Sequence, residues 1–337
     1  MSISAAIANA VSGLTAASRG TEIVSTNIAN SQTEGYARRE LELSSRLYER
    51  GGGVVINGID RIVNAGLLAD SRLSQAQLGA SDTIAQFHRA MENVVGTATD
   101  ASSLGGSLTA FNAALTNAAA RPDSDVRLSA VVDTATALAN KINKIADDVQ
   151  SARTDAERTI ANDVSRLNSA LERVASLNKQ IAALSAQGKD ASSQMDARQA
   201  AIDSISEIVP LKQVPRDNGQ VALFTTGGGI LLDGTKPASI EFTPAGPISP
   251  GMSLAAGTLS NLRFNGKELT VSQQATMFAK GTISLRFTRS VTRLLPPTKP
   301  RLMLWLAIFT IAYPILPLTR HCQRAAPGCL RTIKTHF

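Results

Sequence analysis

The residues whose chemistry best suits metal binding lie close to the C-terminus. His321 and Cys322 are followed by Cys329 and His336, and imidazole and thiolate are the usual ligands of zinc. Their spacing fits none of the usual pairs of zinc ligands. The sequence therefore predicts no metal centre.

Nucleophilic catalysis has little support in the rest of the chain. Residues 1–268 contain no cysteine, and His88 is their single histidine. This composition excludes a Cys-His nucleophile pair and a histidine metal cluster in residues 1–268 and disfavours a Ser-His nucleophile pair. His88 is expected at the surface or boundary of its helix. The glycine-rich stretches at 51–55 and 225–234 have neither P-loop spacing nor the Gly-x-Gly-x-x-Gly pattern that opens a helix. We therefore predict no enzyme activity, no catalytic residue and no bound cofactor.

The positive charge of the chain is confined to its last part. The 337 residues carry 34 basic and 27 acidic side chains, a formal net charge of +7. Ten of the basic side chains and none of the acidic ones lie in 269–337, so residues 1–268 have a net charge of 24 − 27 = −3. A basic protein suggests nucleic acid or a membrane surface as partner. The mildly acidic body and the lack of a nucleic-acid-binding motif argue against nucleic acid.

Residues 3–28 carry the strictest periodicity in the sequence. Apolar and small residues recur at alternating steps of four and three, as in the seam of a coiled coil. This seam consists of Ile3, Ile7, Ala10, Leu14, Ala17, Thr21, Val24 and Ile28. A lone helix with so narrow a seam is marginally stable in water, so we expect it to associate with other helices. Packing against the protein's own globular domain is the alternative.

The stretch TNIANSQTEGYARR, at 26–39, is expected to end this helix. Asn30 is predicted as the C-terminal residue, because asparagine tolerates the left-handed backbone conformation and caps locally. Gly35 permits a turn. The alternation of Leu41 and Leu43 with charged residues then predicts a strand that opens a β-hairpin.

Helical spacing returns in the segments that follow. A helix is expected over 62–95, with Gly66 and Gly79 as interruptions, and a short helix follows it. No glycine or proline occurs in 124–187, so this segment predicts one helix of about 96 Å at 1.5 Å per residue. Residues 195–209 are expected to return along it as a shorter helix.

These elements predict a mainly α fold with an N-terminal coiled-coil helix and a long rod-like helix hairpin. After residue 210, short apolar runs between Asn-Gly, Gly-Gly-Gly and Asp-Gly turns indicate a small β subdomain. The expected domains are the coiled-coil helix and junction (1–35), a mainly helical domain with a β-hairpin near its start (36–209), the β subdomain (210–268) and an atypical basic, proline-rich tail (269–337).

The N-terminal stretch resembles the motif shared by bacterial flagellar rod, hook and hook-associated proteins. The matching residues are Gly13-Leu14 with Ala16, Asn27-Ile28-Ala29-Asn30, Thr33, Gly35, Tyr36 and Arg38. The resemblance implies that the helix lines the inner tube of an axial structure. It also implies that a junction, represented here by Asn27, Asn30, Gly35 and Tyr36, leads to outer domains. The long helix, the return helix and the β region are most similar to the hook-associated proteins of the hook–filament junction.

The resemblance also implies function and partners. It predicts a structural subunit that joins hook to filament outside the cell and assembles with further copies of itself. The other expected partners are the hook protein, a second hook-associated protein and the flagellar type III export apparatus. Such export uses an uncleaved N-terminus, which agrees with the lack of a secretory signal peptide in residues 1–20.

The tail departs from the family pattern, which closes with a second amphipathic helix. Residues 269–337 contain both cysteines, the single tryptophan and six of the thirteen prolines, and this shift in composition predicts a change of reading frame near residues 270–285. The alternative is a membrane-tethered coiled-coil adaptor, because residues 302–319 form an uncharged stretch of 18 residues. That length is near the minimum for a membrane-spanning helix.

Overall fold

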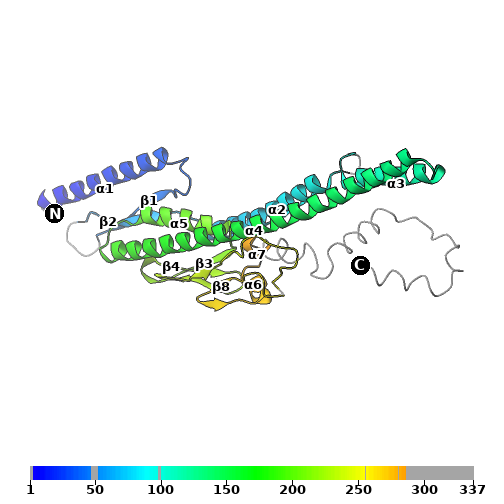
Figure 1. Cartoon of the computed structure of the whole chain (residues 1–337). Helices are drawn as coiled ribbons and strands as arrows, with labels where there is room; N and C mark the ends of the chain where they lie inside the picture. The colour runs from blue at the N-terminus through cyan, green and yellow to red at the C-terminus, as the bar shows by residue number, and fades with distance from the viewer. Residues whose placement is uncertain (1–2, 47–51, 98–99, 255, 280, 286–337) are drawn as a thin grey trace. The chain divides into compact units, whose positions relative to one another are not determined.

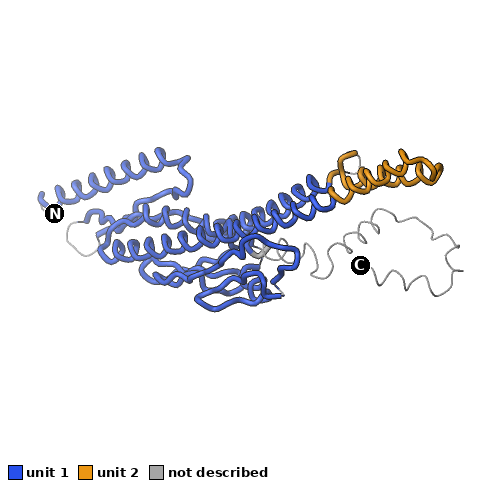
Figure 2. Tube along the Cα trace, in the orientation of Figure 1, with its two compact units in different colours: residues 1–95, 142–294 blue, residues 96–141, 295–337 orange. Residues whose placement is uncertain are grey.

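The computed structural model describes residues 3–46, 52–97, 100–254, 256–279 and 281–285 (Figure 1). The chain divides into two compact units: unit 1 comprises residues 1–95 and 142–294, and unit 2 comprises residues 96–141 and 295–337 (Figure 2). The uncharged stretch at 302–319 lies outside the described residues. Within the described part of the chain, no helix is both long and apolar enough to cross a bilayer.

The described fold is mainly α, as the sequence predicts. Its α-helices are α1 (Ile3–Ala29), α2 (Ala65–Val95), α3 (Leu104–Ala120), α4 (Asp125–Ala186), α5 (Ser192–Ser206), α6 (Val271–Met277) and α7 (Thr282–Leu285). Its strands are β1 (Arg39–Ser45), β2 (Val54–Arg61), β3 (Leu211–Pro215), β4 (Val221–Thr225), β5 (Ile230–Asp233), β6 (Lys236–Pro237), β7 (Ile240–Glu241), β8 (Arg263–Phe264) and β9 (Lys267–Glu268).

The strands form three small antiparallel sheets. β1 and β2 make a separate hairpin, whereas β3-β4-β5-β6 and β7-β8-β9 make the predicted β subdomain after residue 210. Left-handed backbone at Asn218 (φ 55°) and Gly219 (φ 70°) reverses the chain between β3 and β4. This is the conformation that an Asn-Gly sequence favours between two strands.

Unit 2 contains α3 and the first part of α4. Ser103 caps α3, because its side chain accepts a hydrogen bond of 2.9 Å from the Gly106 N–H. The Arg127 side chain donates 2.7 Å to the Asn117 carbonyl oxygen and so ties α4 to α3. Leu104, Ala114 and Leu138 are buried here.

Unit 1 has its hydrophobic core between the second half of α4, α5 and the β subdomain. On α4 the buried residues follow steps of three and four, as a helix with one apolar face requires; they are Ile160, Val164, Leu167, Leu171, Val174, Asn178 and Ile181. Fully buried residues of α5 and the sheets oppose them, namely Ile202, Ile205, Leu223, Leu231, Leu232 and Ile240. α4 is one helix that ends before Gly188, whose φ is +63°.

The polar part of α4 near residues 152–160, where the apolar pattern thins out, holds a loop of the β subdomain. Arg153 is 6% exposed and donates 2.6 Å to the Met252 carbonyl oxygen, while Glu157 is 1% exposed and accepts 2.7 Å from the Ala245 N–H. Burial raises the pKa of Glu157 above its ordinary value, although the hydrogen bond from Ala245 and the charge of Arg153 act in the opposite direction.

The raised pKa of Glu157 predicts a pH dependence of stability. The folded state holds the proton of Glu157 more tightly than the unfolded state does. The stability that this proton contributes is fully present below the unfolded pKa, whose reference value is 4.5. It is lost as the pH rises through the higher folded pKa. We therefore expect Glu157→Gln to become more stable relative to the wild type as the pH rises. Free energies of unfolding in urea, measured for both proteins at acidic and neutral pH, test this, with the exposed Glu172→Gln as the control. A difference between Glu157→Gln and wild type that stays constant with pH would contradict it.

Gly79 does not interrupt α2, which is continuous from Ala65 to Val95. An added Cβ on Gly79 would lie 3.2 Å from the Thr282 Oγ1 and 3.3 Å from the Glu207 carbonyl oxygen. The glycine thus permits α7 and the end of α5 to approach α2 closely. Gly66, the other expected interruption, also lies inside α2.

Described residues between Leu269 and Ile283 belong to the packed structure of unit 1, although the sequence interpretation places them in the atypical tail. Phe278 is 1% exposed and Ile283 is fully buried, and both join the core cluster. The Thr282 Oγ1 donates 3.0 Å to the Glu207 carbonyl oxygen. The packed body therefore extends at least to Ile283, and residues 286–337 of the predicted tail lie outside the described residues.

Candidate functional site: the seam of α1 and its junction

α1 packs on the β1-β2 hairpin through one face of small and polar residues. Ala16 and Ile23 are buried on this face, and the Ser12 Oγ accepts a hydrogen bond of 3.2 Å from the Val54 N–H at the start of β2. An added Cβ on Gly53 would lie 3.0 Å from the Ser12 Oγ, so the hairpin needs a glycine there to approach the helix.

The predicted seam lies on another face of α1 and is open to solvent. All eight seam residues, Ile3, Ile7, Ala10, Leu14, Ala17, Thr21, Val24 and Ile28, are exposed. The five large aliphatic side chains among them are 56–81% exposed. These five side chains form an exposed apolar stripe along α1. The helix thus packs on its own hairpin, as the alternative sequence interpretation expects, and the association of the seam with other helices stays a prediction.

Asn27 joins the end of α1 to the first residue of β1. Its Nδ2 donates 2.8 Å to the Arg39 carbonyl oxygen, and its Oδ1 accepts from the Arg39 N–H at 3.0 Å and from the Tyr36 hydroxyl at 2.8 Å. One amide side chain thus pairs with both backbone groups of Arg39, as a neighbouring strand would. The guanidinium of Arg39 lies 5.0 Å from the centre of the Tyr36 ring, a cation–π distance.

Asn30 follows the last residue of α1, but it does not adopt the expected left-handed conformation. In the described part of the chain, Asn218 and Asn265 are the non-glycine residues with positive φ. Asn30 instead caps the helix with its side chain, whose Nδ2 donates 3.0 Å to the Thr26 carbonyl oxygen. The left-handed residue of the junction is Gly35, with φ +79°.

Gly35→Ala is expected to destabilise unit 1 by about 1–2 kcal/mol, because a side chain disfavours positive φ. Space is not the obstacle, since an added Cβ would lie 3.6 Å from the Ala200 Cβ. The matched control is Gly13→Ala inside α1, where an added Cβ meets nothing within 4 Å and stability should rise by up to about 1 kcal/mol. Urea unfolding measures both, and equal effects of the two substitutions would contradict the role of Gly35.

Asp196 of α5 fixes the junction to the rest of unit 1, a contact that the sequence interpretation missed. Arg39 and Arg61 are directly paired across β1 and β2, so their side chains lie on the same face of the hairpin. Asp196 accepts from both, at 2.8 Å from the Arg39 Nη2 and 2.6 Å from the Arg61 Nε. Its Oδ1 also accepts 3.2 Å from the Ala37 N–H. No local sequence pattern predicts these contacts of Asp196, because its partners lie 135–159 residues away in the chain.

The other candidates for chemistry do not assemble into a site. His88 is exposed on α2 and its ring contacts Phe87 with 5.8 Å between centroids. No group of three or more histidine, cysteine, aspartate or glutamate side chains suits a metal ion among the described residues. The four C-terminal histidines and cysteines lie outside these residues.

Comparisons with known proteins agree with the position of the junction and the helical body. Residues 7–36 match the family model of the flagella basal body rod protein, and residues 88–286 match that of the flagellar hook-associated protein FlgK helical domain. The chain is 25% identical to flagellar hook-associated protein 1 of Salmonella typhimurium over 251 residues, which are 72% of this chain and 45% of the relative. It is 27% identical to flagellar hook-associated protein 1 of Bacillus subtilis over 220 residues, 61% of this chain and 43% of the relative.

A solved structure shares the fold. The flagellar hook junction protein FlgK from Burkholderia pseudomallei matches with a TM-score of 0.52 and 19% identity, over 66% of this chain and 38% of that protein. The chain thus spans less than half the length of these relatives. Because the FlgK helical-domain model matches more than half of the chain, the protein belongs to the FlgK family of flagellar hook-associated proteins.

Proposed function

We propose that this protein is a structural subunit of the bacterial flagellum that helps to join hook and filament, outside the cell. The relatives are flagellar hook-associated proteins, and the structural neighbour is a hook junction protein. The observation that carries the proposal is the exposed seam of α1 on a helix whose opposite side packs on the β1-β2 hairpin. This role is mechanical and includes no catalytic step.

In this proposal the seam pairs with helices of neighbouring subunits. Full burial of a large aliphatic side chain stabilises by about 1.5–3 kcal/mol. Five such residues can therefore offset the entropic cost of association, about 4–15 kcal/mol. Contacts between different surfaces of identical subunits build open helical or ring-shaped layers, as an axial filament requires.

The contacts of the junction support a fixed orientation of α1 relative to the rest of unit 1. Asn27 holds β1 to the end of α1, and Asp196 holds β1 and β2 to α5. Force on the seam would thus pass through hydrogen bonds and ion pairs into the core of unit 1. The proposed partners are further copies of this chain, the hook protein, a second hook-associated protein and the flagellar export apparatus.

Leu14→Asp is expected to abolish self-association while it leaves the melting temperature of the isolated chain nearly unchanged. Leu14 is 73% exposed, so the folded monomer loses little contact, whereas a charge in a buried seam costs several kcal/mol. Sedimentation velocity over a range of protein concentrations measures association. Recovery of the chain with sheared flagella, in cells that lack their own junction protein, measures incorporation.

The control is Ala8→Asp, an exposed α1 position outside the seam that carries the same change in charge and helix propensity. Ala8→Asp should associate and incorporate as the wild type does. The seam would be excluded as an assembly surface if Leu14→Asp also assembled normally, or if the wild-type chain remained monomeric and absent from flagella.

A further inference from the structure

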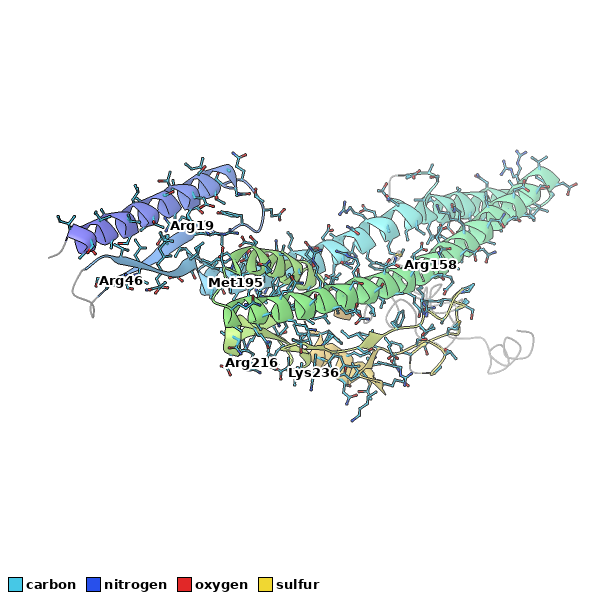
Figure 3. The ribbon with its side chains drawn as sticks, turned by 90° about the vertical axis from the view of Figure 1, so that its left-hand side faces the viewer. Arg19, Arg46, Arg158, Met195, Arg216 and Lys236 are labelled. Carbon is cyan, nitrogen blue, oxygen red and sulfur yellow. The ribbon has the colours of Figure 1, made fainter. Side chains whose placement is uncertain are left out.

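A cavity of about 250 Å³ lies inside unit 1, between the start of α2, α5 and β3. Its lining joins two kinds of surface. The guanidinium groups of Arg61, Arg72 and Arg198 face apolar residues that include Leu68 and Ile202. Met195, labelled near the start of α5 in Figure 3, borders the same cavity.

Two of the three arginines have carboxylate partners. The Arg61 Nε donates 2.6 Å to Asp196, which already accepts from Arg39. The Arg72 Nε donates 2.6 Å to Asp203, and its Nη1 donates 2.7 Å to the Gln213 Oε1. Arg72 is 4% exposed, and its buried Nη2 has no hydrogen-bond partner among the described residues. A buried guanidinium N–H without an acceptor is costly.

Arg198 has no carboxylate within 4.0 Å among the described residues, although it is 8% exposed. Its Nη1 donates to two neutral oxygens, 2.9 Å to the Asn178 Oδ1 and 2.6 Å to the Gly219 carbonyl oxygen. Burial and the nearby charge of Arg61 lower the pKa of Arg198 to about 10. The site therefore holds a buried cation that no carboxylate of the described residues pairs with.

The arginines that line the cavity and their carboxylate partners leave an excess of one positive charge. Arg61, Arg72 and Arg198 contribute three, and Asp196 and Asp203 remove two. No acidic residue lines the cavity itself. Arginine forms paired hydrogen bonds to carboxylates in preference to most other groups.

We propose that this cavity binds a carboxylate carried on a short apolar chain. The carboxylate occupies the space between Arg198 and Arg72, and the apolar part lies against Leu68 and Ile202. A free small carboxylic acid and a glutamate side chain of another polypeptide share this chemistry. Ala65 and Ala69 are exposed residues of α2 that line the cavity, and the proposal places the entrance beside them.

Calorimetric titration of the full chain at constant ionic strength tests the site. Butyrate represents a free acid, N-acetylglutamate methylamide represents a polypeptide side chain, and butyramide is the uncharged analogue. We expect at least one of the two carboxylates to bind and butyramide not to bind. Tighter binding of the glutamate compound assigns the site to a polypeptide partner, and tighter binding of butyrate assigns it to a free acid.

Two variants locate the binding. Arg198→Gln should weaken binding about tenfold or more, because it removes charged hydrogen bonds. Ala69→Leu should block the entrance and abolish binding, and its exposed position preserves the fold even if Arg198→Gln unfolds. Arg158→Gln, an exposed change on α4, should bind as the wild type does. Equal affinity for butyramide, no binding of either carboxylate, or unchanged binding in Ala69→Leu would overturn the proposal.

Discussion

Replacing Asp196 with alanine is expected to destabilise unit 1 by about 3 kcal/mol, because it leaves two largely buried guanidinium groups without their carboxylate. The side chains of Arg39, Arg61 and Asp196 are only 13–14% exposed. The two arginines also stand directly opposite each other on β1 and β2, where like charges repel. Without Asp196 that repulsion is no longer compensated, and the Ala37 N–H loses its acceptor.

Two measurements separate the expected effects of Asp196→Ala. Urea unfolding followed by circular dichroism gives the loss of stability. Hydrogen exchange should show faster exchange in β1 and β2 than in the core of α4, because the hairpin loses its attachment to α5. Asp155→Ala is the control, since its pair with Arg158 is 68–69% exposed and should contribute less than about 1 kcal/mol. Similar losses for both variants would show that Asp196 is no more than a surface charge.

Asn178→Leu should have an effect of the same size or larger, about 3–5 kcal/mol, although the leucine side chain has the same number of heavy atoms in the same branched arrangement. Asn178 is fully buried. Its Nδ2 donates 2.8 Å to the Val221 carbonyl oxygen and 2.6 Å to that of Gly234, and its Oδ1 accepts from Arg198 and from the Val221 N–H. Leucine would leave these buried partners unsatisfied, and each costs about 1–3 kcal/mol unless water reaches it.

Gln180→Leu is the matched control for Asn178→Leu. Gln180 lies two residues further along α4, is exposed, and bonds only to Ser176 at 3.3 Å. Its replacement should change the free energy of unfolding by less than about 0.5 kcal/mol. If Asn178→Leu were as stable as the wild type, then the amide of Asn178 would not be needed to hold α4 to the β subdomain.

The sequence by itself determined the elements whose information is local. The heptad of residues 3–28 identified a helix with one apolar stripe, and that stripe is exposed along its length. The lack of glycine and proline predicted α4 as one helix, and Gly188 predicted its end within two residues. Turn glycines likewise indicated the hairpins after residue 210. Periodicity and backbone preference act over a few residues, so the sequence displays them directly.

Only the tertiary structure decided which polar residues hold these elements together. Asp196 reaches Arg39 and Arg61 across more than 130 residues, and a single partly buried carboxylate leaves no periodic signal. Asn178 occupies an apolar position of the α4 repeat, yet the strands it meets require an amide. The exposed seam, in contrast, has no partner among the described residues of its own chain, because α1 meets the hairpin through the different face that carries Ser12, Ala16 and Ile23.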